Sequence, residues 1–267
     1  MTYRMIFSDM DGTLLKNDME ISEKNITTIK KATQKGVEFV ICTGRGVYGV
    51  ERFLKQLDLL GKKGYVICQN GAAVYDLENM NMVVKHAFSA DELRPVVEAA
   101  RRLGVDIYLY DDRTFLTEKV TTEAKNYCKV MGADMRILED GLAYEGHFTK
   151  CLLSAKPALL EQLRSEIAPL TTETFNIFYS GPYYLEVVKK GVSKGNALAE
   201  TAKKAGVPLS EVIAVGDSEN DLSMIQKAGL GIAVGNAVED VKNAANVVLQ
   251  ETYAEDAVAT LIEKFVL

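Results

Sequence analysis

Residues 3–14 of the chain read YRMIFSDMDGTL, an apolar segment that leads directly into two aspartates and a glycine. Tyr3–Ser8 has the length and composition of a short buried strand. Asp9 and Asp11 therefore stand where this strand is expected to end. Apolar segments of strand length and helical segments alternate after it, which predicts an α/β fold.

The segments that follow continue this alternation. Ser22 is expected to cap a helix that runs to Lys35. Val37–Cys42 is a nearly continuous apolar run, which is typical of a strand buried on both faces of a parallel sheet. A helix at Val47–Leu57 and a strand at Tyr65–Cys68 are predicted next.

Between residues 83 and 188 the regular alternation stops, and tyrosine-rich segments of strand length appear. In this region Ser89 and Glu92 have the spacing of a capping box, and Pro157 suits the first turn of a helix. A hairpin is expected around Ser180–Pro182. The pattern predicts an inserted domain with a mixed sheet and helices.

The alternation returns after this insertion, where Ser193 is expected to cap a helix and Glu211–Val215 reads as an apolar strand. The two flanking regions therefore predict one split domain, a Rossmann-like core with a parallel sheet and helices on both faces. We place the core at residues 1–82 and 189–267, and the inserted α+β domain at residues 83–188.

The chain carries 37 acidic and 31 basic residues, a net charge of -6, without a block of lysines or arginines. This balance gives no electrostatic footprint for nucleic acid or for an anionic membrane. No apolar run approaches the roughly 18 residues of a spanning helix, and the N-terminus lacks the regions of a secretory signal. We expect a cytoplasmic protein, a monomer or weak homo-oligomer, whose partner is a small molecule.

The content of cysteine and histidine limits the chemistry further. The four cysteines lie far apart without a CxxC pair, and neither of the two histidines lies near the polar motifs. A zinc site, a disulfide framework and Ser/His or Cys/His catalysis are therefore disfavoured. Carboxylates are expected to carry the chemistry.

Three polar clusters each follow an apolar strand: Asp9–Thr13, Thr43–Arg45 and Gly216–Asp221. One Asp-x-Asp pair by itself more often marks a turn or a helix cap. The carboxyl ends of parallel strands, however, meet at one edge of a sheet, where ligands bind. Three clusters at strand ends therefore predict a single site.

The charges in these clusters favour a bound cation and a phosphate. Asp9, Asp11, Asp217 and Asp221 would repel one another strongly without a divalent metal, and oxygen ligands suit Mg²⁺ beside a phosphate. Lys194 opens a predicted helix, where its ammonium and the helix dipole would both favour an anion. By itself Lys194 would be interpreted as a surface charge.

Four motifs resemble the ordered motifs of haloacid dehalogenase superfamily phosphatases: DMDGTL at 9–14, CTGR at 42–45, GVSKG at 191–195 and GDSEND at 216–221. The match spans nearly the whole chain. The insertion between the second and third motifs resembles the large cap of the Cof-type branch, subclass IIB. Members of that branch are mostly phosphatases of sugar phosphates and related metabolites.

The resemblance implies a role for each acid. Asp9 would be the nucleophile that forms an aspartyl phosphate, and Asp11 the acid, then base, that serves the leaving group and water. Mg²⁺ would be held by a carboxylate oxygen of Asp9, the backbone carbonyl of Asp11 and the Asp217 side chain. Asp221 would support these ligands without binding the metal itself.

The resemblance also implies a set of groups that hold the transferring phosphoryl oxygens. They are the Thr43 hydroxyl, Lys194, Asn220 and the backbone amides near Met10 and Gly44. Gly12 would permit the tight turn after the acid. Asn70-Gly71 matches a loop of the family as well, but a plain turn explains that pair equally well, so we leave it out of the predicted site.

Other functions fit parts of the sequence. Gly44–Gly49 matches GxGxxG, but the next strand, Tyr65–Cys68, leads into Gln69-Asn70 and offers no acid for a ribose, which disfavours a dinucleotide oxidoreductase. A sugar phosphomutase of the same fold would carry the same four motifs. A binding module that is merely phosphorylated on aspartate is disfavoured by Asp11, because a nearby acid shortens the life of an acyl phosphate.

The tyrosines of the insertion could stack on a sugar, but packing is the usual role of aromatic residues in strands. We interpret them as packing residues: Tyr108, Tyr110, Tyr179, Tyr183 and Tyr184.

Overall fold

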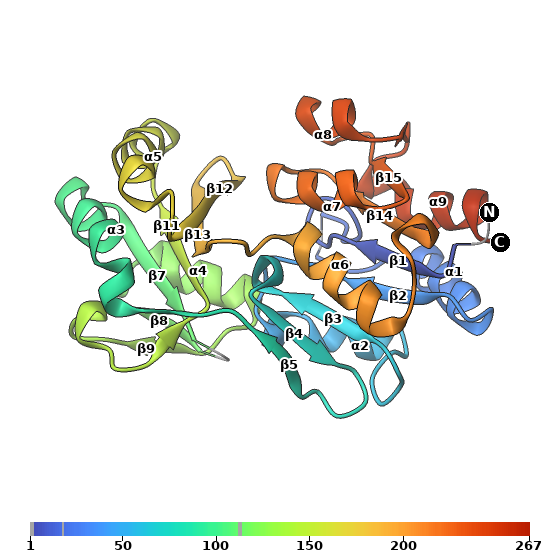
Figure 1. The fold of residues 1–267 in the computed structure, drawn as a ribbon, viewed down its shortest axis with the longest axis horizontal. Coiled ribbons are helices and arrows are strands. Elements are labelled where there is room, and N and C mark those ends of the chain that lie inside the picture. The colour runs from blue at the N-terminus through green and yellow to red at the C-terminus, as the bar shows by residue number, and fades with distance from the viewer. Residues whose placement is uncertain (1–2, 18, 112–113) are drawn as a thin grey trace. The chain divides into compact units, whose positions relative to one another are not determined.

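The computed structural model describes residues 3–17, 19–111 and 114–267. The chain forms two compact units, drawn together in Figure 1. The first unit comprises Met1–Gly44, Glu51–Val83 and Ser193–Leu267, and the second comprises Arg45–Val50 and Val84–Val192.

A five-stranded parallel sheet organises the first unit, in the order β16-β15-β14-β1-β2. The strands are β1 (Met5–Ser8), β2 (Glu38–Ile41), β14 (Val212–Gly216), β15 (Leu230–Ala233) and β16 (Val247–Val248). All residues of β1 and β14 are buried, as the apolar sequence predicts for central strands of a parallel sheet. Because β1 lies between β14 and β2, the carboxyl ends of these three strands are neighbours.

Helices connect and cover these strands. They are α1 (Glu23–Gln34), α2 (Glu51–Gln56), α6 (Lys194–Ala205), α7 (Leu222–Lys227), α8 (Glu239–Ala244) and α9 (Ala257–Phe265). The Ser22 hydroxyl accepts from the Asn25 amide at the start of α1, and Ser193 serves α6 in the same way. Helix α1 packs with α9, and α6 packs with α7. The predicted α/β class with a parallel sheet and helices is thus confirmed.

The helix predicted at Val47–Leu57 was wrong in its extent. The structure has a 3-10 turn at Val47–Gly49 and then the short helix α2. Gly49 lies so close to the Met131 carbonyl oxygen that a Cβ would be 2.7 Å away from it. The 3-10 turn and Met131 belong to the second unit, whereas α2 belongs to the first.

A smaller sheet follows in the order β3-β4-β5, made of Tyr65–Cys68, Ala73–Asp76 and Met82–Lys85. Strands β3 and β4 are antiparallel, and Cys68 pairs with Ala73. A parallel bridge between Cys42 and Ile67 joins β3 to the end of β2.

The second unit contains a six-stranded sheet in the order β12-β13-β11-β7-β8-β9. Its strands are β7 (Asp106–Tyr110), β8 (Phe115–Thr117), β9 (Met135–Ile137), β11 (Lys150–Ser154), β12 (Phe175–Gly181) and β13 (Tyr184–Lys189). A short antiparallel pair adds β6 (Phe88–Ser89) and β10 (His147–Phe148). The helices are α3 (Ala90–Leu103), α4 (Thr122–Met131) and α5 (Pro157–Thr171).

Two apolar clusters hold the second unit together. Helices α3 and α5 pack in one cluster, while α4 contributes Tyr127 to another cluster with Tyr108, Tyr110 and Phe115. The packing interpretation is confirmed for Tyr108 and Tyr110, each 1% exposed, and is wrong for Tyr183, which is 55% exposed. The capping box at Ser89, the first-turn position of Pro157 and the β12–β13 hairpin are confirmed as well.

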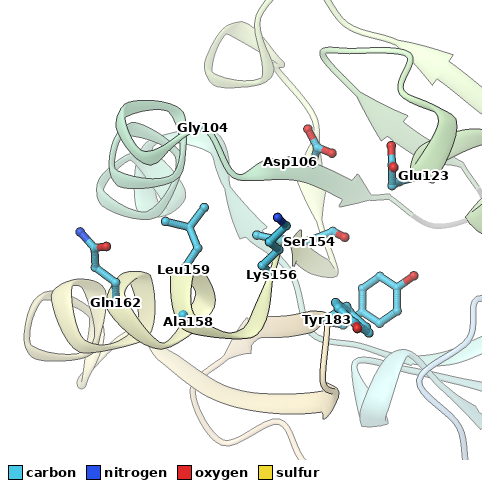
Figure 2. Close-up of a pocket in the computed structure, with 11 residues that line it drawn as sticks. Gly104, Asp106, Glu123, Ser154, Lys156, Ala158, Leu159, Gln162 and Tyr183 are labelled. Atoms are coloured by element: carbon cyan, nitrogen blue, oxygen red, sulfur yellow. The ribbon is translucent and has the colours of Figure 1, made fainter.

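The second unit also has a hollow of about 820 Å³, shown in Figure 2. Asp106 and Glu123 line it together with Lys156, Tyr183 and Tyr184. No residue of the predicted site lines this hollow. Over the stretches 3–17, 19–111 and 114–267, no helix has both the length and the apolar character needed to cross a bilayer.

Candidate active site

Three neighbouring strands of the first unit deliver the predicted polar clusters to one edge of the sheet. Asp9 follows β1, Thr43 follows β2 by two residues, and Asp217 follows β14 directly. The sheet pairing continues past the strand ends, because the Asp9 amide donates to the Val215 carbonyl at 3.0 Å. Register alone therefore brings these distant segments together.

Lys194, the first residue of α6, lies between two of the acids. Its Nζ is 2.5 Å from Asp9 Oδ1 and 2.6 Å from Asp221 Oδ1, and its side chain is fully buried. The Ser193 cap fixes the start of the helix, so the lysine projects from a defined turn. A buried ammonium that touches two carboxylates is not the surface charge that Lys194 would be by itself.

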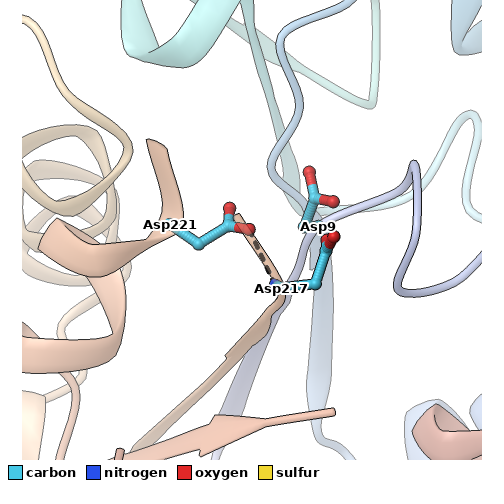
Figure 3. A group of neighbouring side chains, drawn as sticks. All are labelled: Asp9, Asp217 and Asp221. Carbon is cyan, nitrogen blue, oxygen red and sulfur yellow. Dashed lines mark hydrogen bonds between the residues drawn. The ribbon is translucent and has the colours of Figure 1, made fainter. Parts of the chain in front are cut away.

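Asp9, Asp217 and Asp221 have carboxylate oxygens that all lie within 4.8 Å of one another (Figure 3). Asp221 is committed to the protein: its Oδ1 accepts from Lys194, and its Oδ2 accepts from the backbone amides of Asp217 and Ser218. Asp217 accepts from the hydroxyls of Thr13 and Ser218, at 3.0 and 2.9 Å. Those hydroxyls and amides orient the cluster.

The electrostatics of the cluster favour a further cation. Burial, and then the charge of Asp221, raise the pKa of Asp9 well above its usual range, and the same two causes raise the pKa of Asp217 to about 6. Burial opposes the charged form of Lys194, but Asp221 and Asp9 nevertheless hold its pKa well above the usual value. One ammonium thus faces three carboxylates, and an oxygen-ligated divalent metal fits this donor set.

Gly12 closes the turn that carries the two motif aspartates. Its φ is +80°, and a Cβ would lie 2.6 Å from Asp217 Oδ2. Position 12 therefore requires glycine for two reasons: the positive φ and the close approach of the Asp217 carboxylate. Asp11 lies exposed at this turn, and its carboxylate is not one of the three clustered acids.

The predicted phosphate-binding residues lie on the same segments as the acids. Met10 and Thr43 are buried, and Gly44 follows Thr43. Asn220 lies in the 3-10 turn Glu219–Asp221, and its Nδ2 donates to Asn70 Oδ1 at 3.0 Å. The roles of these residues stay predictions, but all of them belong to the first unit.

Some residues of this site were missed from the sequence. Thr13 and Ser218 hold Asp217, and Asn70 holds Asn220. Thr13 and Ser218 lie inside the DMDGTL and GDSEND motifs, but nothing in the sequence marks their hydroxyls as partners of Asp217. For Asn70 the signal is the Asn-Gly pair, which a plain turn explains equally well.

Comparison with known proteins gives a consistent result. The family model described as haloacid dehalogenase-like hydrolase matches residues 6–262. A 5-amino-6-(5-phospho-D-ribitylamino)uracil phosphatase of Bacillus subtilis is 31% identical over 264 residues, which cover 99% of this chain and 96% of the relative.

Solved structures match over nearly the whole chain. A haloacid dehalogenase-like hydrolase from Bacteroides thetaiotaomicron has a TM-score of 0.88 at 32% identity, covering 98% of this chain and 99% of its own. A sugar phosphatase of haloacid dehalogenase subclass IIB has a TM-score of 0.85 at 23% identity, covering 98% of each chain. The second likeness concerns the fold alone.

Proposed function

Because this chain belongs to the haloacid dehalogenase-like hydrolase family and is a phosphoric monoester hydrolase, we propose that it is a magnesium-dependent phosphatase of small metabolites. The single observation that supports this most is the buried cluster of Asp9, Asp217 and Asp221 around Lys194 at the carboxyl ends of β1 and β14. That arrangement suits a metal and a phosphoryl group side by side.

The proposed substrates are phosphomonoesters of sugars or similar metabolites. The Bacillus subtilis relative is named for a substrate whose phosphate sits on a ribityl chain. The net charge of -6 gives no general attraction for nucleic acid, so a small phosphorylated metabolite is the better candidate substrate. We infer further that the second unit is the cap domain that selects among such substrates.

Asp9, Asp217 and the backbone carbonyl of Asp11 would hold Mg²⁺ in this proposal. The metal would supply positive charge against the phosphoryl oxygens. Asp221 would act from outside the ligand shell, since its oxygens are already taken by Lys194 and two backbone amides.

The chemistry that we propose for the side chains has two steps. In the first, a carboxylate oxygen of Asp9 bonds to phosphorus, the bond to the leaving oxygen breaks, and Asp11 gives that oxygen its proton. In the second, Asp11 takes a proton from water, whose oxygen bonds to phosphorus, and inorganic phosphate leaves Asp9. The exposed position of Asp11 allows it to exchange protons with solvent.

The remaining groups would bind the phosphoryl oxygens through both steps. Lys194 stays charged, because two buried carboxylates raise its pKa against the effect of burial. The Thr43 hydroxyl, the Asn220 amide and the backbone amides of Met10 and Gly44 would add fixed donors.

Product analysis with purified protein and Mg²⁺ tests this proposal. A panel of sugar phosphates is incubated with the protein, and both inorganic phosphate and isomeric sugar phosphates are quantified. We expect stoichiometric release of inorganic phosphate. An isomeric sugar phosphate without free phosphate would instead identify a phosphomutase of the same fold.

A further inference from the structure

The loop between β3 and β4 has an unusual backbone. Gln69, Asn70 and Gly71 all have positive φ, of 51°, 57° and 99°, and the first two are at most 1% exposed. Left-handed conformation is unfavourable for a residue with a side chain, and glutamine is not one of the types that tolerate it well. Strain of this kind persists only where surrounding contacts hold it, and it clusters at functional sites.

The contacts of this loop are with three segments of the candidate active site. The Asn70 amide donates to the Thr43 carbonyl at 3.0 Å, and Asn70 Oδ1 accepts from Asn220 Nδ2 at 3.0 Å. Gly71 approaches the start of α6 so closely that a Cβ would lie 2.7 Å from the Ser193 carbonyl oxygen. One short loop therefore touches the residue before Lys194 and the two segments that carry Thr43 and Asn220.

The bond to Asn220 has a chemical consequence. A side-chain amide presents either its NH₂ group or its oxygen, and only the NH₂ group attracts a phosphoryl oxygen. In this structure Asn70 presents its Oδ1, an acceptor, and Asn220 faces it with Nδ2. One Nδ2 proton is used in that bond, and the second is left for a ligand. In the part of the chain that the structure describes, the buried Asn220 Oδ1 has no hydrogen-bond partner that would hold the amide instead.

We propose that Asn70 is a positioning residue for the phosphoryl group, which acts by fixing the amide of Asn220 while its own backbone amide holds Thr43. This inference rests on the proposed function, because Asn220 and Thr43 are phosphate ligands only there. Asn70 itself does not touch the substrate.

Asn70→Gly tests the side chain in isolation. Glycine tolerates the positive φ and keeps the backbone amide bond to Thr43, while the side-chain oxygen that accepts from Asn220 is removed. We expect kcat/KM for a sugar phosphate to fall about tenfold and inorganic phosphate to bind about tenfold more weakly, less than the loss of a direct oxyanion donor. Asn70→Ala provides a second variant without the acceptor, should the glycine variant not fold.

A double-mutant cycle with Asn220→Ala separates positioning from a general structural effect. If Asn70 acts through Asn220, then N70G/N220A has the same kcat/KM and phosphate affinity as N220A alone. Losses that multiply in the double variant would overturn the inference. Asn79→Gly is the matched control, since Asn79 is exposed in a turn where its backbone amide, which glycine keeps, bonds to Asp76.

Calorimetric titration of inorganic phosphate with Mg²⁺ present distinguishes failure of this inference from failure of the proposed function. If wild-type protein binds phosphate but releases none from esters, the proposed function fails, while weaker binding by N70G still supports the role of Asn70. Equal phosphate affinity in wild type and N70G overturns the inference whatever the activity. Wild-type protein that neither hydrolyses esters nor binds phosphate overturns both.

Discussion

Each unit of this molecule buries ionic side chains, but the balance of charge differs. In the first unit, Lys194 is fully buried between Asp9 and Asp221, and a third acid, Asp217, lies within the same cluster. In the second unit, Lys150 and Glu186 form a pair with an Nζ–Oε2 distance of 3.2 Å, with 1% and 4% of the side chains exposed.

The difference suggests a structural role for the pair in the second unit and a ligand-binding role for the cluster in the first. One lysine and one glutamate can neutralise each other, and Lys150 gains a further contact with the Tyr110 ring, whose centroid is 4.5 Å from Nζ. Three acids against one lysine leave negative charge in a buried place, which is costly unless a cation joins them. A buried imbalance of charge therefore points to a ligand, and a buried balance does not.

The largest effect expected from this comparison is on catalysis. Asp9→Asn keeps the shape of the side chain but removes the carboxylate that we propose as the nucleophile, and with it one acidic group of the cluster. We expect hydrolysis of a sugar phosphate to fall by roughly four orders of magnitude or more, as for other catalytic nucleophiles. Single-turnover phosphate release measures this loss.

Circular dichroism of the Asp9→Asn variant should match that of wild type, because the substitution lowers the repulsion in the cluster. Activity near the wild-type level would rule out covalent catalysis by Asp9.

Breaking the balanced pair should act on stability instead. Lys150→Met removes the ammonium that lies 3.2 Å from the buried Glu186 carboxylate, and removal of one partner of a buried pair typically costs about 3–5 kcal/mol. Urea unfolding of the variant measures this change in the free energy of unfolding.

The control for Lys150→Met is the double variant K150M/E186L, in which both charges are replaced by apolar groups. It should recover most of the lost stability. Equal stability of the single and double variants would mean that the pair is not a unit.

Magnesium should stabilise the unbalanced cluster. At a concentration about 100 times its dissociation constant, a metal that binds only the folded protein adds about 2.7 kcal/mol to the free energy of unfolding. Thermal unfolding with Mg²⁺ or with a chelator measures this difference, and the chelator should also abolish hydrolysis.

Asp217→Asn should remove most of the stabilisation by magnesium, because Asp217 is a proposed ligand. A melting temperature that is indifferent to Mg²⁺ in wild-type protein would contradict a metal site at this cluster.

The smallest effect is expected at the surface. Arg94 and Asp91 are 47% and 85% exposed and lie 2.7 Å apart on α3. Exposed ion pairs of this kind contribute little to the free energy of unfolding, because water and salt screen the attraction between the charges. Arg94→Ala should leave the unfolding midpoint and the activity unchanged. A clear loss of stability would contradict the expectation that buried ion pairs matter more than exposed ones.

Short sequence patterns were enough to predict most of the fold and the sheet edge at which the site lies. Apolar runs and caps such as Ser22 and Ser193 act over a few residues, so the sequence locates those helices closely. The ends of β1, β2 and β14 could be grouped because parallel strands share one edge.

Contacts between distant segments could not be predicted in the same way. Gly49 lies close to Met131 at the point where the predicted helix is interrupted, and no residue near Gly49 in the sequence indicates this contact. The bond from Asn220 to Asn70 spans 150 positions, and an Asn-Gly pair by itself indicates only a turn. The second unit was harder for the same reason, since its sheet is assembled from segments with no regular alternation.

The chain enters the second unit twice, first for the six residues Arg45–Val50 and later for Val84–Val192. Exchange of the longer segment alone, by recombination or by design, would leave behind a piece that belongs with it. A transplanted unit would have to bring its own version of the hexapeptide, which begins immediately after Thr43-Gly44. A change of the second unit that includes this hexapeptide therefore alters residues directly next to the proposed phosphate ligands in the chain.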